Sequence, residues 1–303
     1  DRELASMDLL FRHRRAFALG HGTAGDWNRD ETLSEKGATD VVSTAAMPSY
    51  DLKPIRPRTS AYQGDTNLRL SMGFLHLPDG SAPEAAIIAA LTELADDYEA
   101  WIEDQKVVAV GLPQPLGEAA DSNIANCEQC ALRIRKGIDL LNNEPDAMLA
   151  FRLMNKAMYV QQYHSRLKRR EAGSDYPEPC PSGGGSVWYP FQLAFILMNL
   201  ASTFDPDDDE RKLVDLIWFP TGGGKTEAYL GLSAFSLFLR RLTDPHDVGT
   251  HVLMRYTLRL LTAQQFQRAT GLMCAMEYLR RQHPDALGEE PFSAGIWVGG
   301  DTT

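Results

Sequence analysis

The chain has 303 residues, of which 44% are hydrophobic and 23% charged, and its formal net charge is −11 at pH 7. These values are ordinary for a globular protein with a packed core, and the length allows about two domains. No apolar run approaches the roughly 18–20 residues that a membrane span needs, and four cysteines in a chain of this length fit a reducing cytoplasm.

The acidic balance does not exclude a nucleic-acid partner. Net charge mainly sets solubility and non-specific attraction, whereas a groove for a nucleic-acid strand is a local feature. Arginine and lysine do cluster locally, at 12–15, at 166–170 and at 255–268. The first two clusters are interpreted as solvated helix faces.

The first 80 residues predict a mixed α/β region. Residues 9–19 fit either a helix or a strand, and β-like pieces follow at 41–47 and 68–77, interrupted by proline and glycine. The run 20–25 matches G-x-G-x-x-G, but polar turn residues follow where a dinucleotide site needs a helix. We therefore interpret that match as accidental.

Residues 81–170 predict a helical accessory region. Apolar residues recur every three or four positions over 83–104, and helical patterns continue over 124–141 and 144–170. One stripe of the last pattern predicts a core contact rather than a ligand surface: Phe151, Met154, Met158 and Tyr159.

Cys127 and Cys130 have the spacing of a pair of metal ligands. No second pair of ligands follows, so a zinc site would have to recruit Cys180, His164 or groups from elsewhere. Because the pair falls inside a helical pattern, two buried thiols are favoured over zinc.

Residues 171–188 are rich in proline and glycine and predict a linker and domain boundary. A helix is expected from Tyr189 to Leu200. The acidic run 205–210 follows, and it resembles a set of Mg²⁺ carboxylates. It precedes the glycine-rich loop described next, whereas a carboxylate of the Walker B type should end a later strand, so we expect a solvated turn here.

From residue 213 onwards, strand and helix patterns alternate. Strands are predicted at 213–219, 251–256 and 294–298, with helices between them at 227–242 and 260–282. Such alternation predicts a parallel sheet flanked by helices. The expected fold class is therefore α/β: a helix-rich accessory region with some β structure, followed over 189–303 by the first part of a RecA-like P-loop domain.

A glycine-rich loop joins the first of these strands to its helix, and its residues are those of a phosphate-binding loop: Thr221, Gly222, Gly223, Gly224, Lys225 and Thr226. Glycine lets successive backbone N–H groups turn toward one anion, and the helix N-terminus adds partial positive charge. Lys225 is expected to reach the β- and γ-phosphates of ATP, and the Thr226 hydroxyl to ligate Mg²⁺. The alternative is a glycine-rich turn with a surface lysine, which the strand–loop–helix context disfavours.

The loop 220–226 resembles motif I of superfamily 2 helicases and translocases, with Phe219 in place of the first glycine of the general rule. Upstream, the run 189–192 (Tyr-Pro-Phe-Gln) resembles the Q-type element of that superfamily. The resemblance implies that Gln192 and an aromatic ring contact adenine. A proline at the first position of a helix explains the run equally well.

Downstream, residues 252–265 resemble motif Ia of the same superfamily, with Arg259, Leu261 and Gln264 at matching positions and Thr257-Leu258 in place of Pro-Thr. Residues 296–300 resemble a strand that ends in a Gly-Gly pair. The resemblance implies that a nucleic-acid backbone is bound by Thr257, Arg259, Gln264, Gly299 and Gly300. An ordinary turn explains the last two nearly as well.

Three longer segments, 11–22, 150–158 and 253–265, together resemble the DrmA family, the helicase-like subunits of the DISARM bacterial anti-phage systems. The resemblance covers most of the chain and is weakest at 28–80. It implies a DNA-stimulated ATPase that acts on single-stranded DNA or DNA with a single-stranded overhang. It also implies a companion subunit of the DrmB type and a DNA methyltransferase that marks the host genome.

No motif II carboxylates, motif III or second RecA-like domain with arginine fingers appear by Thr303. We therefore expect the chain to be part of a longer protein and not to hydrolyse ATP efficiently by itself.

The leading hypothesis is an ATP-dependent DNA helicase or translocase. The alternatives are an ATP-dependent DNA-binding switch, or restriction-type loading subunit, that does not unwind strands, and a non-catalytic module with a vestigial loop. Unwinding assays would separate the first two, and the intact Lys225-Thr226 pair disfavours the third.

Overall fold

The computed structural model describes residues 2–13, 16–28, 38–45, 69–76, 84–166, 186–218, 224–257 and 259–297. The chain forms two compact units, Asp1–Arg56 with Ala100–Gln129 and Pro57–Glu99 with Cys130–Thr303. The division falls within two long helices, α4 (Glu84–Val110) and α5 (Leu116–Asn143). The domain boundaries expected at residues 80, 170 and 188 stay a prediction.

The first unit contains a helix and a two-stranded hairpin: α1 (Arg2–Leu10), β1 (Ala24–Trp27) and β2 (Val42–Ala45). The strands pair antiparallel, with Ala24 opposite Ala45. Phe17 packs edge-on against Trp27, with 6.0 Å between the ring centroids. Strand β2 lies within the β-like piece predicted at 41–47, so that β structure is confirmed.

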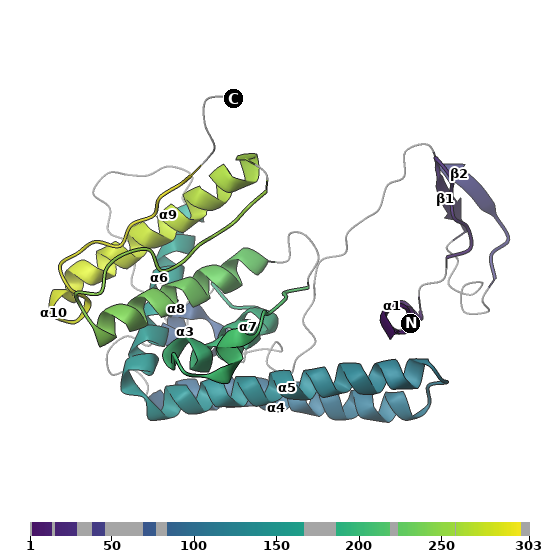
Figure 1. Ribbon diagram of the computed structural model, residues 1–303, viewed down its shortest axis with the longest axis horizontal. Helices are drawn as coiled ribbons and strands as arrows, with labels where there is room; N and C mark the ends of the chain where they lie inside the picture. The colour runs from purple at the N-terminus through teal and green to yellow at the C-terminus, as the bar shows by residue number, and fades with distance from the viewer. Residues whose placement is uncertain are drawn as a thin grey trace. The chain divides into compact units, whose positions relative to one another are not determined.

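The second unit is built from helices. Besides the adjoining parts of α4 and α5, it contains α3 (Met72–His76), α6 (Pro145–Arg166), α7 (Pro190–Phe204), the 3-10 helix η3 (Asp209–Lys212), α8 (Lys225–Thr243), α9 (Arg259–Gln282) and α10 (Pro284–Leu287). Helix α6 lies at the centre and packs against α3, α8 and α9 (Figure 1). Its residues Phe151, Met154 and Met158 are completely buried, which confirms the predicted core stripe. The chain is thus helix-rich, with a small antiparallel sheet.

The β-like piece predicted at 68–77 is mostly wrong. Only Ser71 pairs as a strand would, in an isolated antiparallel bridge with Val187. From Met72 the chain is helical, because Met72 and Leu75 fall three residues apart and both are buried on one face of α3. So short a run of apolar residues could not distinguish the two-residue period of a strand from the 3.6-residue period of a helix.

A buried tryptophan connects α6 to the segment before α7. The Trp188 indole N–H donates to the side-chain oxygen of Asn155 at 2.8 Å, and both residues are fully buried. Gly231 on α8 lies against the same ring, since a Cβ there would come within 2.9 Å of both Trp188 and Ile196. These contacts hold α7 and α8 side by side, and the candidate site lies at the N-termini of these two helices.

The three segments predicted as strands of a parallel sheet run alongside the helices without pairing to a strand within the described part of the chain (Figure 1). Exposed and half-buried side chains nevertheless alternate along 214–218 and 251–256, as along a strand with one covered face. Val214, Leu216 and Trp218 are 95%, 79% and 82% exposed. A strand forms its hydrogen bonds only with a neighbouring strand, and a hydrophobic pattern does not show whether such a neighbour exists.

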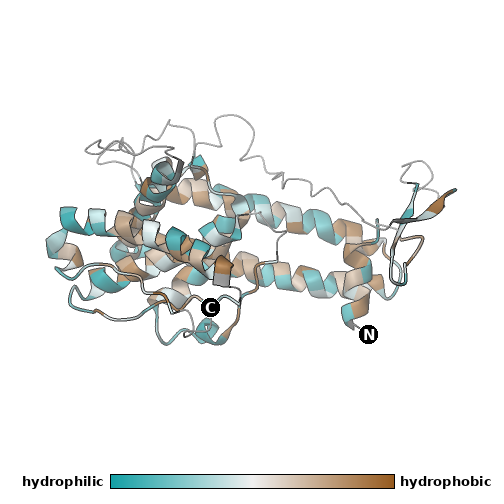
Figure 2. Cartoon of the chain, turned by 90° about the horizontal axis from the view of Figure 1, so that it is seen from above, coloured by the Kyte–Doolittle hydropathy of each residue, from teal (hydrophilic) through white to brown (hydrophobic). Residues whose placement is uncertain are grey.

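Figure 2 shows by colour that the long helices carry both hydrophobic and hydrophilic residues. None of the helices in the described ranges is both long enough and apolar enough to span a membrane.

Candidate nucleotide site

Helix α8 begins directly after the glycines of the predicted phosphate loop. Gly224 is the N-cap of α8, with φ 85° and ψ 21°, and Lys225 and Thr226 are the first two helical residues. Both are half-buried. Their side chains therefore stand at a helix N-terminus, where free N–H groups and the helix dipole favour an anion. Thr221, Gly222 and Gly223 lie outside the described residues.

Gln192 connects this N-terminus to helix α7. Its side-chain oxygen accepts a hydrogen bond from the Tyr189 N–H at 2.8 Å, and its Nε2 donates to the Gly224 carbonyl at 2.7 Å. Pro190 does occupy the first position of α7, so a proline at a helix start accounts for part of the run 189–192. It does not account for Gln192, which is 97% buried and holds two elements together.

Gly224 is required on two counts. Its positive φ is unfavourable for a residue with a side chain. In addition, a Cβ there would lie 2.7 Å from the Nε2 atom of Gln192. The Gln192 amide thus packs directly against the Gly224 backbone at the start of α8, where a side chain would displace it. Gly224, Lys225 and Thr226 are residues that fit the phosphates of ATP and its Mg²⁺, which the sequence predicts here.

An exposed aromatic surface adjoins the same point. The rings of Tyr189 and Phe191 are stacked, with 6.1 Å between centroids and 13° between planes. Tyr189 is 39% exposed, and its ring is 3.7 Å from the position that a Cβ of Gly224 would take. A planar base could stack on such a face.

Four further residues surround the start of α8, and sequence analysis assigned no site role to them. The hydroxyl groups of Thr226 and Tyr229 are 3.3 Å apart, and Tyr256 is a neighbour of Tyr229. Burial and the neighbouring Tyr229 raise the pKa of Tyr256. Glu227, next to Thr226, forms an ion pair with Arg268 on α9. The only signal in the sequence was the i, i+3 spacing of Thr226 and Tyr229, which places them on one face of α8.

Three of the predicted DNA-binding residues follow Tyr256 closely along the chain. Thr257 is exposed at the end of the extended segment 251–257, Arg259 is the first residue of α9, and Gln264 is exposed two turns into that helix. Gly299 and Gly300 lie outside the described residues. Extended chain therefore ends at Thr257 and helix α9 begins at Arg259, with residue 258 outside the described residues, so motif Ia stays a prediction.

An ion-pair cluster holds the segment that leads to the loop. Arg133 on α5 donates to both carboxylate oxygens of Asp215, at 2.6 and 2.8 Å, and to Glu210 at 3.1 Å. Lys136 pairs with Asp208 at 2.6 Å. The expectation of a solvated turn over 205–210 is thus wrong for Asp208, whose side chain is only 6% exposed. The basic partners come from α5, some seventy residues earlier, so the local sequence gave no sign of them.

Other candidate features lie elsewhere. Cys127 and Cys130 are half-buried on α5, and Cys180 is outside the described residues. Within the described ranges, no group of three His, Cys, Asp or Glu residues could hold a metal ion.

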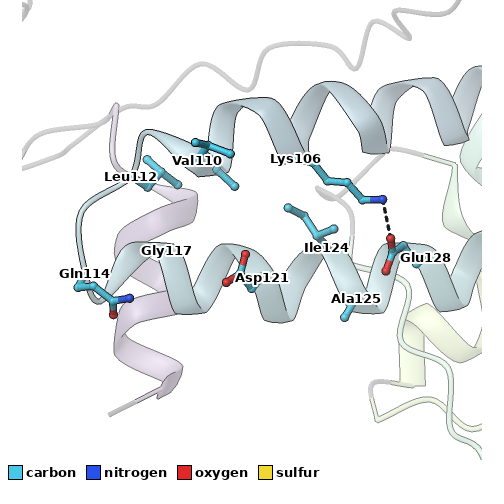
Figure 3. Close-up of a pocket in the computed structure, with 10 residues that line it drawn as sticks. Lys106, Val110, Leu112, Gln114, Gly117, Asp121, Ile124, Ala125 and Glu128 are labelled. Carbon is cyan, nitrogen blue, oxygen red and sulfur yellow. Dashed lines mark ion pairs between the residues drawn. The ribbon is translucent and has the colours of Figure 1, made fainter.

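The end of the α4–α5 hairpin encloses a hollow of about 540 Å³ (Figure 3). Lys106 points across it to Glu128, 2.7 Å away, and both side chains are about half exposed. Hydrogen bonds that the Lys106 ammonium donates to Glu103 and Glu128 raise the pKa of Lys106 to about 12. The ammonium group therefore remains protonated at neutral pH and cannot act there as a base or nucleophile.

No known family model matches this sequence. The fold and the geometry at α8 describe a helix-rich chain with a glycine-capped Lys-Thr pair at a helix start. Over 98% of its length, the chain is 37% identical to the DISARM protein DrmA of Bacillus paralicheniformis (strain ATCC 9945a / NCIMB 11709 / CD-2). It is therefore a DrmA-like protein, and it spans 26% of the length of that relative.

Proposed function

We propose that this chain carries the ATP-binding part of a DISARM anti-phage defence protein, a DNA-dependent ATPase of the superfamily 2 helicase or translocase type. The observation that carries the proposal is the hydrogen bond from Gln192 to the Gly224 carbonyl at the N-terminus of α8, directly before Lys225 and Thr226. It puts a helix start, a cation and a hydroxyl at the end of a glycine-rich loop.

In this proposal the phosphates of ATP lie against residues 221–226. Lys225 neutralises phosphate charge, and Thr226 holds Mg²⁺, which supplies electrostatic stabilisation of the phosphoryl group when bound. The base lies against the stacked rings of Tyr189 and Phe191. The resemblance to the Q-type element places Gln192 beside the adenine, and its two internal hydrogen bonds hold the side chain in one orientation there.

The DNA strand is bound at the turn before α9, by Thr257, Arg259 and Gln264, with the Gly299-Gly300 pair as a second backbone contact. Contacts of this kind position a strand without reading its sequence, so single-stranded DNA of any sequence is the expected partner. A companion subunit of the DrmB type and a cytoplasmic location belong to the same proposal.

The extended segments complete a RecA-like domain in the whole protein. Residues 213–218, 251–256 and 294–297 become parallel strands when neighbouring strands pair with them. Two observations support this. Side-chain exposure alternates along the first two segments, and the exposed apolar side chains Leu216, Trp218 and Leu253 are typical of a face that another layer covers.

ATP hydrolysis by the complete protein tests the proposal. We expect turnover that single-stranded DNA stimulates, and we expect Lys225→Ala to abolish it. Lys212→Ala is the matched control, because Lys212 is 80% exposed and pairs only locally with Asp209. ATP turnover that DNA does not change would exclude a DNA-driven motor. Turnover that persists in Lys225→Ala would exclude residues 221–226 as the ATP site. Strand-unwinding assays then separate a helicase from an ATP-dependent switch.

A further inference from the structure

Helix α6 lies at the centre of its unit (Figure 1), yet one of its faces stays outside the core. Residues spaced three or four apart along that face are exposed or half-buried, whereas most residues between them are buried. This solvent-facing stripe consists of Leu149, Arg152, Lys156, Tyr159 and Tyr163. Gln161 lies on the opposite side of the helix, two residues from each tyrosine, and its Cγ is 3.7 Å from the position that a Cβ of Gly271 on α9 would take. The stripe therefore faces away from α9.

Three aromatic rings gather at the C-terminal end of this stripe. The rings of Tyr159 and Tyr163 are nearly parallel, with 6.4 Å between centroids and 16° between planes. His164 is exposed and stands edge-on to Tyr163, with 5.7 Å between centroids. Tyr159 was expected in the core; it is half-buried and packs against the core on one side. The rings thus form a supported aromatic surface that reaches solvent.

Helix α6 is also basic, in a chain whose net charge is −11. After Asp146 its sequence contains Arg152, Lys156 and Arg166 and no Asp or Glu. Arg152 pairs with Glu84 at 3.1 Å, and Lys156 lies one turn before Tyr159 on the same face. Three further basic residues follow in the sequence at 168–170, outside the described residues. The aromatic surface therefore lies beside positive charge.

Charge and aromatic rings together select one class of ligand. An acidic peptide or an anionic lipid headgroup would complement the charge, but neither presents a flat face to Tyr163. A DNA duplex keeps the faces of its bases inside the stack. A single strand offers both phosphates for a cation and free base faces for an aromatic ring.

We propose that Lys156, Tyr159, Tyr163 and His164 form a second contact for single-stranded DNA, in which bases stack on the rings and a phosphate lies against Lys156. This inference rests on the proposed function for the nature of the partner. It goes beyond that function because the contact lies on α6 and needs no nucleotide. Stacking on an aromatic face accepts any base, so the contact has no sequence preference.

The affinity of the complete protein for two fluorescent strands of equal length tests the stacking. One strand is ordinary single-stranded DNA, the other is abasic, and no nucleotide is present. Tyr163→Leu keeps an apolar side chain and removes the ring. We expect it to lower affinity for the ordinary strand about fivefold or more and affinity for the abasic strand less than about twofold. Tyr163→Phe should retain both affinities. Tyr278→Leu is the control, because Tyr278 lies late in α9 and is 41% exposed.

The phosphate contact has its own variants. Lys156→Gln should weaken both strands alike and lower the salt dependence of binding by about one released counterion. Lys156→Arg should restore both properties, since it keeps the charge.

Cross-linking locates the contact without any variant. Strands that contain 5-iododeoxyuridine are irradiated on the wild-type protein, and mass spectrometry identifies the residues that are joined to them. We expect cross-links at Tyr163 or His164.

The possible failures are distinguishable. If the wild type binds DNA but Tyr163→Leu binds it equally well, the α6 contact is overturned and the proposed function stands. Equal losses for the ordinary and the abasic strand, or cross-links confined to other segments, overturn it in the same way. If the wild type binds no single-stranded DNA, the proposed DNA partner fails and the α6 contact fails with it.

Discussion

The Gln192 side chain donates from Nε2 to the carbonyl oxygen of Gly224 over 2.7 Å, across 32 residues of sequence. The same amide caps helix α7 by accepting from the Tyr189 N–H. One buried side chain thus satisfies two backbone groups at two helix starts, and it fixes where the Lys225-Thr226 pair begins. The account of the nucleotide site depends on this connection.

Gln192→Leu keeps the volume of the side chain and removes both hydrogen bonds. The variant should lose about 1–3 kcal/mol of unfolding free energy, because the Gly224 carbonyl and the Tyr189 N–H lose their partner. Affinity for ATP should fall about tenfold or more. Thermal unfolding and nucleotide titration check these effects, with Gln129→Leu on the exposed face of α5 as the control. Unchanged affinity would mean that the connection does not shape the site.

Gly224→Ala should weaken nucleotide binding more than stability. The substitution forces an L-residue to φ 85° and puts its Cβ 2.7 Å from the Gln192 amide nitrogen. The conformational cost alone is about 1–2 kcal/mol. Gly249→Ala is matched, since Gly249 has φ 120° but nothing within 4 Å of the added Cβ. It should lower stability and leave nucleotide affinity unchanged. Equal effects of the two on affinity would contradict the crowding argument.

Two glycines in helices should respond to alanine in opposite directions. At Gly137 on α5, a Cβ would lie 2.1 Å from the Leu197 carbonyl oxygen on α7, so Gly137→Ala must separate two backbones. We expect a loss of more than about 2 kcal/mol. At Gly271 on α9 the nearest atom is 3.7 Å away, and Gly271→Ala should gain roughly 0.5–1 kcal/mol from helix propensity. Thermal unfolding of both variants tests the α5–α7 packing; a stable Gly137→Ala would show that the two backbones are not this close.

Stability should fall in acid through Asp208 and Asp215. Hydrogen bonds from Lys136 and Arg133 respectively hold the pKa of each carboxyl below its ordinary value of 3.8. A lowered pKa in the folded state means that the stabilisation is fully present above pH 3.8. It is lost as the pH falls through the folded-state pKa below that value.

Asp215→Asn should therefore cost about 1–3 kcal/mol at pH 7 and flatten the stability curve below pH 4. Asp139→Asn, on the exposed face of α5, serves as the control. Urea unfolding of both variants from about pH 2.5 to 7 measures these effects, because the two aspartates titrate within that range. An unchanged acid slope in Asp215→Asn would contradict the role given to its pairing with Arg133.

Local patterns predicted the helices and the start of α8 well, because period, glycine and helix propensity act over a few residues. The positions of α4, α5, α6, α7 and α9 and the core role of Phe151 follow from those patterns alone. The contacts between distant segments did not follow. Asp208 was expected in solvent, but Lys136 on α5 pairs with it, and Ser71 pairs with Val187 while Met72 begins a helix.

The candidate site divides along the same line. Gly224, Lys225 and Thr226 were evident from type and spacing, since few other uses require those residues in that order. Tyr229, Tyr256 and Arg268 were not, because they come together only when α8, α9 and the segment between them pack. Only tertiary structure brings Arg268 on α9 to Glu227 on α8.

The most direct test of the central claim is calorimetric titration of the complete protein with ATP, with and without Mg²⁺, in the wild type, Lys225→Ala and Thr226→Val. We predict that the wild type binds ATP more tightly with Mg²⁺ and that Thr226→Val loses this dependence. Lys225→Ala should weaken binding at least about tenfold, which corresponds to one lost charge-assisted contact. Equal affinities in all three proteins would contradict a nucleotide site at the start of α8.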